Sequence, residues 1–257
     1  MKITVLGCGA SSGVPAIGCD CPVCTSENPK NKRTRVSILV ESGDTRILVD
    51  TPPDMRMQCL REGIKTVDAI IYTHAHADHI SGIDDTRSFN YQNNAPVPIY
   101  SEHITLKQLQ DKFAYCFLPP KPTTLGWFRP CLVPTIVEPP QPFTIGSVEV
   151  KPFWQQHGPN RSLGLRFGNM AYSTDVNELP EESLQILEGV DYWIVDCLRY
   201  EAAPTHAHLA LTLGWIERIK PKAAYLTHMS HGLDYDTLLK ELPENVFPAF
   251  DGLVITA

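Results

Sequence analysis

The 257-residue sequence contains no apolar run that approaches the length of a membrane-spanning helix. Its first residues, MKITVLGCGASSG, hold an apolar stretch that is too short for a secretory signal peptide. We therefore expect a cytoplasmic protein that does not interact with a membrane.

An excess of positive charge is also missing. Lys and Arg number 22 against 29 Asp and Glu, which gives a formal net charge of -7 at pH 7. This balance argues against a protein with a general nucleic-acid-binding surface, because such surfaces attract the phosphate backbone through positive charge. A small anionic substrate would need locally placed cations.

A phosphate-binding P-loop is absent, since no Gly-Lys-Ser/Thr sequence follows the glycine-rich segment from Gly7 to Gly13. The sequence has eight cysteines, which are not expected to form disulfides in a reducing compartment. Three of them, Cys19, Cys21 and Cys24, lie within the short segment GCDCPVC. This spacing is typical of a structural zinc site, which needs a fourth ligand; buried or reactive thiols are the alternative.

Apolar runs bounded by turn residues predict strands along most of the chain. They cover residues 2–7, a hairpin over 35–50, and residues 67–73, 143–154, 162–168, 169–175, 191–197, 223–228 and 252–257. Helices are expected over 55–64, 104–115, 180–188, 208–219 and 235–242. Prolines and aromatic residues crowd residues 117–142, which predicts a loop-rich insertion. These patterns indicate one α/β domain over residues 1–257, with two sheets face to face and helices outside.

The segment HAHADH, from His74 to His79, places three histidines and an aspartate directly after an apolar strand. In extended backbone, His74 and His76 point the same way and can bind one ion. Asp78 and His79 follow and are directed toward a neighbouring position. Because imidazole is the commonest metal ligand, the segment predicts part of a metal site.

Further ligand candidates follow other strand-like stretches, namely His157, Asp175 and His228. Each residue alone is more often a hydrogen-bonded polar side chain than a metal ligand. Their shared position at strand ends, where loops gather functional groups, favours a common site.

Together these residues resemble the signature of the metallo-β-lactamase fold superfamily, HxHxDH followed by later His, Asp and His. The resemblance implies an αββα sandwich of two mixed β-sheets flanked by helices. It also implies a dinuclear site with His74, His76 and His157 on one ion, Asp78, His79 and His228 on the other, and Asp175 bridging them. Asp50, at the end of an early strand, matches an aspartate that orients ligand histidines.

A closer resemblance rests on the loop GxGxSxGVPxxGCxCxxC and the ending LTHxSH, which are similar to the PhnP-like phosphoribosyl cyclic phosphate phosphodiesterase branch. It implies that His231 completes the zinc site and that His206, in PTHAHL, is a general acid. His208 could orient His206 or cap the following helix.

The implied reaction is hydrolysis of a small cyclic phosphate ester, similar to phosphoribosyl 1,2-cyclic phosphate, by a hydroxide that bridges two metals. Asp78 and Asp175 would be catalytic as well as metal-binding. Arg161 and Arg199 are candidate substrate contacts, since guanidinium groups bind phosphate through paired donors. The active-site ligands accept zinc or manganese, whereas the thiolates favour zinc.

Other activities share the histidine signature. A tRNA 3′-processing nuclease usually has a basic arm, which this sequence does not show, and a thiolester or β-lactam hydrolase does not call for the cysteine loop. A non-enzymatic PQQ-biosynthesis-like binding protein shares the cysteine loop but has a depleted ligand set. The sequence leaves a homodimer open.

Overall fold

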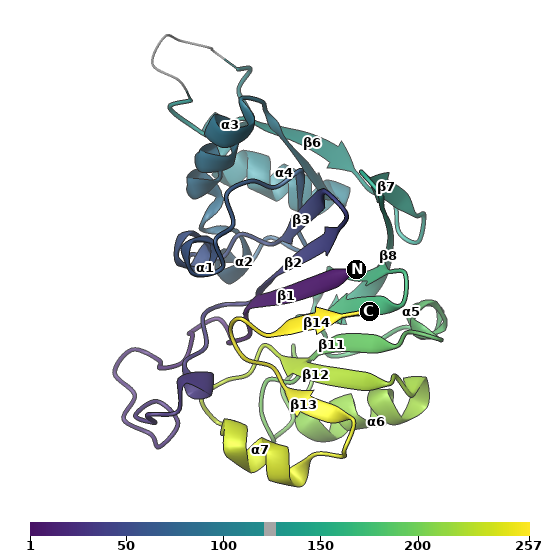
Figure 1. Ribbon diagram of the computed structural model, residues 1–257. Coiled ribbons are helices and arrows are strands. Elements are labelled where there is room, and N and C mark those ends of the chain that lie inside the picture. The colour runs from purple at the N-terminus through teal and green to yellow at the C-terminus, as the bar shows by residue number, and fades with distance from the viewer. Residues whose placement is uncertain (121–126) are drawn as a thin grey trace.

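Two mixed β-sheets packed face to face form the centre of the protein, as seen in a computed structural model that describes residues 1–120 and 127–257 (Figure 1). The first sheet has the order β14-β1-β2-β3-β4-β5-β6 and the second β13-β12-β11-β10-β9-β8-β7. The strands are β1 Lys2–Gly7, β2 Ser37–Ser42, β3 Thr45–Val49, β4 Ala69–Ile71, β5 Val97–Ser101, β6 Leu132–Ile136, β7 Phe143–Ile145, β8 Val148–His157, β9 Asn160–Phe167, β10 Met170–Ser173, β11 Tyr192–Asp196, β12 Ala223–Thr227, β13 Val246–Pro248 and β14 Val254–Thr256.

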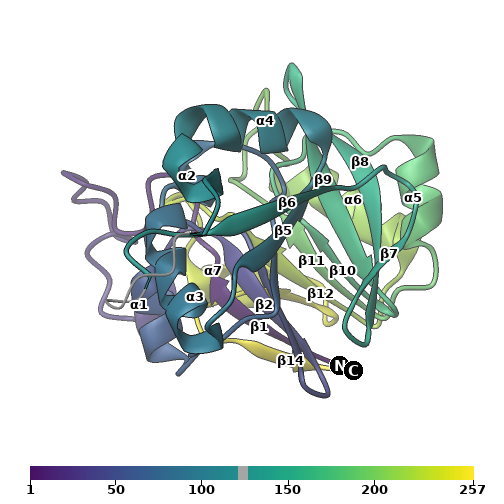
Figure 2. The same ribbon diagram turned by 90° about the horizontal axis from the view of Figure 1, so that it is seen from above.

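Helices cover the outer faces of both sheets (Figure 2). They are α1 Met55–Arg61, α2 Ala77–Ile80, α3 Arg87–Asn93, α4 His103–Lys112, α5 Glu181–Leu187, α6 Leu209–Ile219 and α7 Tyr235–Glu241, with short 3-10 turns η1 Pro29–Asn31, η2 Ile83–Thr86 and η3 Ala114–Phe117. The expected αββα architecture is therefore confirmed. None of the helices among the described residues is long and apolar enough to cross a bilayer.

The apolar strands of the first sheet are buried on both faces. In β2, Ile38 and Val40 join the core between the sheets, whereas Leu39 points the other way, into a second core beneath the helices. Neighbouring β3 repeats the pattern, with Ile47 and Val49 inward and Leu48 outward. This two-sided burial explains why these strands read as almost continuous apolar runs.

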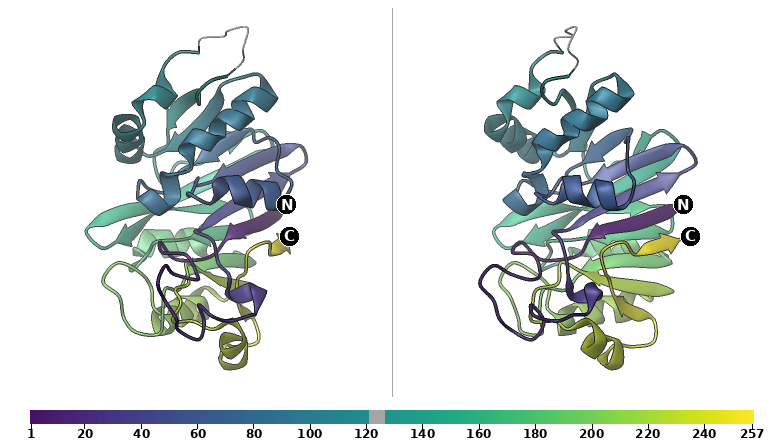
Figure 3. Two further views of the ribbon diagram at one scale, coloured as in Figure 1. Left: turned by 90° about the vertical axis from the view of Figure 1, so that its left-hand side faces the viewer. Right: turned by 60° about the vertical axis from the view of Figure 1, so that its left-hand side comes forward.

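The fold brings together loops that are far apart in sequence. Strands β3, β4 and β5 run parallel to one another, as do β10, β11 and β12. Because parallel strands end at the same edge of a sheet, the loops after β3, β4, β10, β11 and β12 gather on one side of the sandwich. Figure 3 (left) views the molecule from this side.

The proline-rich segment 117–142 contains more regular structure than its composition suggests. Residues Leu132–Ile136 form β6, the edge strand of the first sheet, paired only with β5 among the described strands. Pro134 lies in its middle, which an edge strand tolerates because one side needs no ladder hydrogen bonds. Residues 121–126 of the predicted insertion lie outside the described residues.

A glycine in β9 sets the packing between β9 and β8. Gly164 is directly opposite Phe153, and a Cβ atom at this position would overlap the Phe153 ring. We predict that Gly164→Ala lowers the free energy of unfolding by about 1–3 kcal/mol, because a packed core cannot absorb the added methyl. Urea unfolding measures the change.

Gly214 provides the matched control. It lies inside α6, and a Cβ there would meet nothing within 4 Å. Gly214→Ala should leave stability unchanged or raise it by about 0.5–1 kcal/mol, since alanine favours a helix. Equal stability of the two variants would contradict the packing argument.

Candidate metal centre

Two groups of potential metal ligands meet at the side of the sandwich where the parallel strands end. The first group is His74, His76, His157 and Asp175, and the second group is Asp78, His79, Asp175 and His228. Within each group the ligand atoms lie within 4.8 Å of one another. The structure thus brings together all seven side chains that the sequence singled out, in the same two sets.

The carboxylate of Asp175 divides its oxygens between the two groups. Its Oδ1 lies 3.7 Å from His74 Nε2 and 3.6 Å from His157 Nε2. Its Oδ2 lies 3.0 Å from His79 Nε2 and 3.6 Å from His228 Nε2. This arrangement suits a carboxylate that bridges two cations.

Several ring nitrogens in the centre lack a hydrogen-bond partner. Among the described residues, these buried atoms include Nε2 of His74, of His79 and of His228. A buried polar atom without a partner is costly and uncommon in folded proteins. The unpartnered nitrogens, all directed at Asp175, fit a divalent metal ion as their missing partner.

Backbone and carboxylate groups orient the histidine rings. Asp50 Oδ2 lies 2.7 Å from His79 Nδ1, and the Asp50 carboxylate accepts hydrogen bonds of 2.8 Å from both N and Oγ1 of Thr73. The Thr205 carbonyl lies 2.7 Å from His157 Nδ1. The contacts to His79 and His157 occupy Nδ1 and leave Nε2 on the side of Asp175, as is usual for metal-binding histidines.

Three residues of the centre adopt left-handed backbone conformations. Asp50, Asp175 and His228 have φ values of 63°, 56° and 57°. Each of them follows the end of a strand, where the chain must turn sharply to direct the side chain into the centre. This conformation costs roughly 1–2 kcal/mol for a residue with a Cβ atom, so the surrounding contacts must hold it in place.

The two groups differ in electrostatics. Burial is the main reason that the pKa values of His74, His76 and His157 are lowered, which keeps these rings neutral and able to bind metal. Burial also acts on His228, but the carboxylates of Asp175 and Asp78 outweigh it and raise its pKa to about 9. A metal ion must therefore displace a proton from the second group.

His206 lies beside the centre and contacts a residue that the sequence reasoning missed. Its Nδ1 is 3.1 Å from Asp196 Oδ2, and its ring stacks on His228 with 4.5 Å between centroids. Asp196 is fully buried at the end of β11 and also accepts a hydrogen bond from the backbone N–H of Val176. One signal could have identified Asp196: it lies at the end of a strand, beside the strands that precede Asp175 and His228.

His208 occupies the N-cap position of α6 but makes no side-chain hydrogen bond to the helix. Of the roles that the sequence left open for His208, side-chain capping is therefore not realised.

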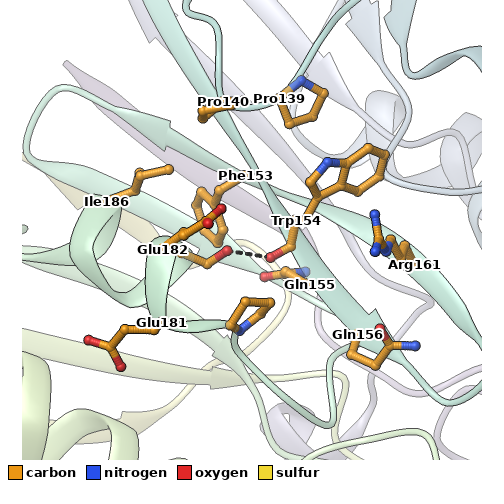
Figure 4. Close-up of a pocket in the computed structure, with 12 residues that line it drawn as sticks. Pro139, Pro140, Phe153, Trp154, Gln155, Gln156, Arg161, Glu181, Glu182 and Ile186 are labelled. Carbon is orange, nitrogen blue, oxygen red and sulfur yellow. Dashed lines mark hydrogen bonds between the residues drawn. The ribbon is translucent and has the colours of Figure 1, made fainter.

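The two predicted arginines lie outside the cluster of ligands. Arg161 pairs with Gln156, and His157 pairs with Asn160, so Arg161 points to the opposite face of the β8–β9 hairpin from His157. Its guanidinium lies 5.3 Å from the Trp154 ring centroid, at a pocket of about 360 Å³ (Figure 4). Arg199 donates to the carbonyls of Glu201 and Ala202 in its own loop.

The three cysteines form a separate group, with sulfur atoms within 4.8 Å of one another. A hydrogen bond from the Cys24 N–H lowers the pKa of the Cys21 thiol, whereas burial raises the pKa of Cys24 to about 11. His231, the expected fourth ligand, is exposed, and within the described chain its imidazole is not part of this group. Its backbone carbonyl lies 3.8 Å from Cys21 Sγ.

Arg33 joins the cysteine loop to the loop that carries His228. Its side chain is 1% exposed and donates to the carbonyls of Ser230 and Leu233 at 3.0 and 2.7 Å. Its backbone pairs with Val14, at the start of the cysteine loop. The loop after His228 is therefore anchored by a buried guanidinium.

Sequence comparison finds related proteins. Over 98% of its length the chain is 34% identical to a protein of Porphyromonas gingivalis named octanoyltransferase, but it spans only 51% of that protein. A 33% identical match to the coenzyme PQQ synthesis protein B of Methylobacterium radiotolerans covers 32% of each protein.

Solved structures match the whole chain. A diphosphatase from the PhnP family has a TM-score of 0.91 and 37% identity, with 100% of this chain and 97% of that chain covered. Zn²⁺-bound PqqB from Methylobacterium extorquens has a TM-score of 0.80 over 100% of both chains, but its 18% identity supports the fold alone.

A family model described as the Beta-lactamase superfamily domain matches residues 45–229, well over half of the chain. This segment contains every residue of the two ligand groups. The protein therefore belongs to the β-lactamase superfamily, with the metallo-β-lactamase fold.

Proposed function

We propose that the protein is a metal-dependent phosphodiesterase of the PhnP-like branch, acting on a small cyclic phosphate ester similar to phosphoribosyl 1,2-cyclic phosphate. The observation that carries the proposal is the division of the Asp175 oxygens between two ligand groups beside the His206–Asp196 pair. The full-length similarity to a PhnP-family diphosphatase supports related chemistry, since the name of that protein also describes hydrolysis at phosphorus.

The ligand groups would hold two divalent ions, zinc or manganese, with Asp175 shared between them. Bound ions of this kind lower the pKa of water and offset the negative charge of a phosphate. The cysteine group would hold a structural zinc ion, with His231 as the proposed fourth ligand because its loop already contacts Cys21.

His206 would donate a proton to the departing sugar oxygen. Its Nδ1 faces Asp196, which orients the ring and leaves Nε2 to carry the transferred proton. Asp196 itself is held by the backbone N–H of Val176, so that the orientation is rigid.

Substrate would enter from the side of α2. His76 is exposed and Asp78 is half-buried, whereas the other ligands are buried. The open side of the centre therefore lies at the start of α2, and the buried side excludes water from the metal ligands.

The relative named octanoyltransferase is about twice as long as this chain, so the activity in its name is not transferred to this chain by similarity.

A screen of the metal-reconstituted protein should include five-membered cyclic phosphates, linear phosphodiesters and a thiol ester. We expect turnover of the cyclic phosphates. Turnover of the thiol ester alone would show that the phosphodiesterase proposal is wrong.

Removal of the general acid should slow the reaction. We predict that His206→Ala lowers kcat on a cyclic phosphate by about 10²–10⁴-fold, the usual contribution of a well-placed acid. Asp196→Asn should give a smaller loss, because the ring remains but loses its orientation. His208→Ala, two residues away, is the matched control and should keep nearly full activity; an unaffected His206→Ala variant would remove the assigned role.

Metal removal should lower thermal stability. Saturation at 100 times Kd contributes about 2.7 kcal/mol, which corresponds to roughly 5–10 °C in Tm for a chain of this size. We predict that added manganese or zinc raises the Tm of chelator-treated protein by this amount, measured by calorimetry. Asp175→Asn should abolish most of the shift. Asp191→Asn is the control and should keep the shift, because Asp191 lies just before β11 and its carboxylate pairs with Lys222. A full shift in Asp175→Asn protein would contradict the shared-ligand arrangement.

A further inference from the structure

The segment between β13 and β14 carries the chain from the second sheet to the first, as the yellow ribbon in Figure 1 shows. At one end of this segment, the Ala249 N–H donates to the Leu226 carbonyl in β12 at 2.9 Å. At the other end, the Gly252 N–H donates to the Val5 carbonyl in β1 at 2.8 Å. Asp251 therefore lies at a junction of the two sheets.

The Asp251 carboxylate contacts three different segments of the chain. Its side chain is 9% exposed, and its Oδ1 accepts a 3.2 Å hydrogen bond from the Cys8 N–H, just after β1. Its Oδ2 accepts from the Thr34 N–H at 2.9 Å and also from the Thr34 hydroxyl. The Arg61 guanidinium, at the end of α1, donates to Oδ2 at 3.2 Å. Burial raises the pKa of Asp251, and these donors offset part of the cost of burying its charge.

The contacts of Asp251 begin where the ladder between β1 and β2 ends. The last pair of this ladder joins Gly7 to β2. Beyond it, the backbone of residues 8–10 needs other hydrogen-bond partners to stay in place. Asp251 holds the first of these residues directly. It holds Gly9 through Thr34, whose carbonyl accepts from the Gly9 N–H at 2.8 Å.

Residues 8–10 in turn hold the residue that follows His228. The Met229 N–H donates to the Cys8 carbonyl at 2.9 Å, and the Met229 carbonyl accepts from the Ala10 N–H at 3.2 Å. His228 itself has a φ of 57°, and a left-handed residue with a Cβ atom depends on its surroundings to keep that conformation. The backbone that directs His228 into the centre is therefore held by residues 8–10.

We propose that Asp251 is a positioning residue for the metal centre, which acts on His228 through the backbone of residues 8–10 and of Met229. This inference rests on the dinuclear centre of the proposed function. Within the described chain Asp251 belongs to neither ligand group, so it acts without touching a metal ion. The second group, which contains His228, depends on Asp251 more than the first group, which has no residue from the His228 loop.

The test is a calorimetric titration of chelator-treated protein with Mn²⁺, which favours carboxylate and imidazole ligands over the thiolates of the cysteine group. The wild-type protein should bind two ions in two steps, and His228→Ala identifies the step that needs His228. We expect Asp251→Asn to weaken this same step about 10-fold, the low end of the range for residues that orient metal ligands. The other step should change less than about threefold, because its ligands lie outside the His228 loop.

Two further variants separate positioning from general stability. In the His228→Ala background, Asp251→Asn should have no further effect on Mn²⁺ binding, because the residue that it positions is gone. Thr34→Val removes only the hydroxyl donor to Asp251 and keeps the backbone bonds of residue 34. This milder variant should weaken the His228-dependent step about two- to fivefold.

Asp68→Asn is the matched control. The Asp68 carboxylate accepts a hydrogen bond from the Arg46 N–H at 2.7 Å just before β4, whereas the metal ligands follow the other end of that strand. This variant should leave both Mn²⁺ steps unchanged, and urea unfolding measures the stability cost of each variant. Equal weakening of both steps by Asp251→Asn, or no weakening of either, would overturn the proposal. If the wild-type protein bound fewer than two Mn²⁺ ions, the dinuclear centre itself would fail, and the role of Asp251 with it.

Discussion

The centre of this protein depends on one buried carboxylate. Asp175 is 1% exposed and faces imidazole rings from three different loops, so its charge has no water to stabilise it. Burial alone would raise its pKa, but the imidazoles of His228 and His79 outweigh burial and hold that pKa well below its usual value. The arrangement is self-consistent only when positive charge, from protons or from metal ions, occupies the space around it.

The sandwich provides the rigidity that this charge distribution needs. The two sheets contain eight parallel strands, β3–β6 and β10–β13, and the left-handed residues Asp50, Asp175 and His228 follow three of them, β3, β10 and β12. Residues outside the ligand set then fix the orientation of individual rings: Asp50 contacts His79, Thr205 contacts His157, and Asp196 contacts His206. The ligand side chains are thus oriented by neighbouring residues, and the strands of the two sheets hold those residues in place.

Much of the fold and most of the candidate centre could be predicted from sequence, because the relevant signals are local. A buried strand followed by HAHADH is informative by itself, and the apolar runs mark most strands. Strand β6 was missed because Pro134 interrupts its pattern, and Asp196 because a lone aspartate after an apolar run becomes meaningful only when its strand is known to lie beside β10 and β12. The orientation of Arg161 depends on the register of β8 and β9, which no local pattern determines. The position of His231 depends on an exposed side chain, and its role as a ligand remains a prediction.

The left-handed residues at Asp50, Asp175 and His228 have an implication for engineering. Glycine would adopt these conformations with less steric cost. At these three positions the functional side chains are therefore kept at the expense of folding stability. A library selected only for thermal stability would therefore accumulate glycine at these positions. Its variants would be more stable but would lack the side chains of the metal centre. Selection for stability in this family should therefore leave those codons untouched.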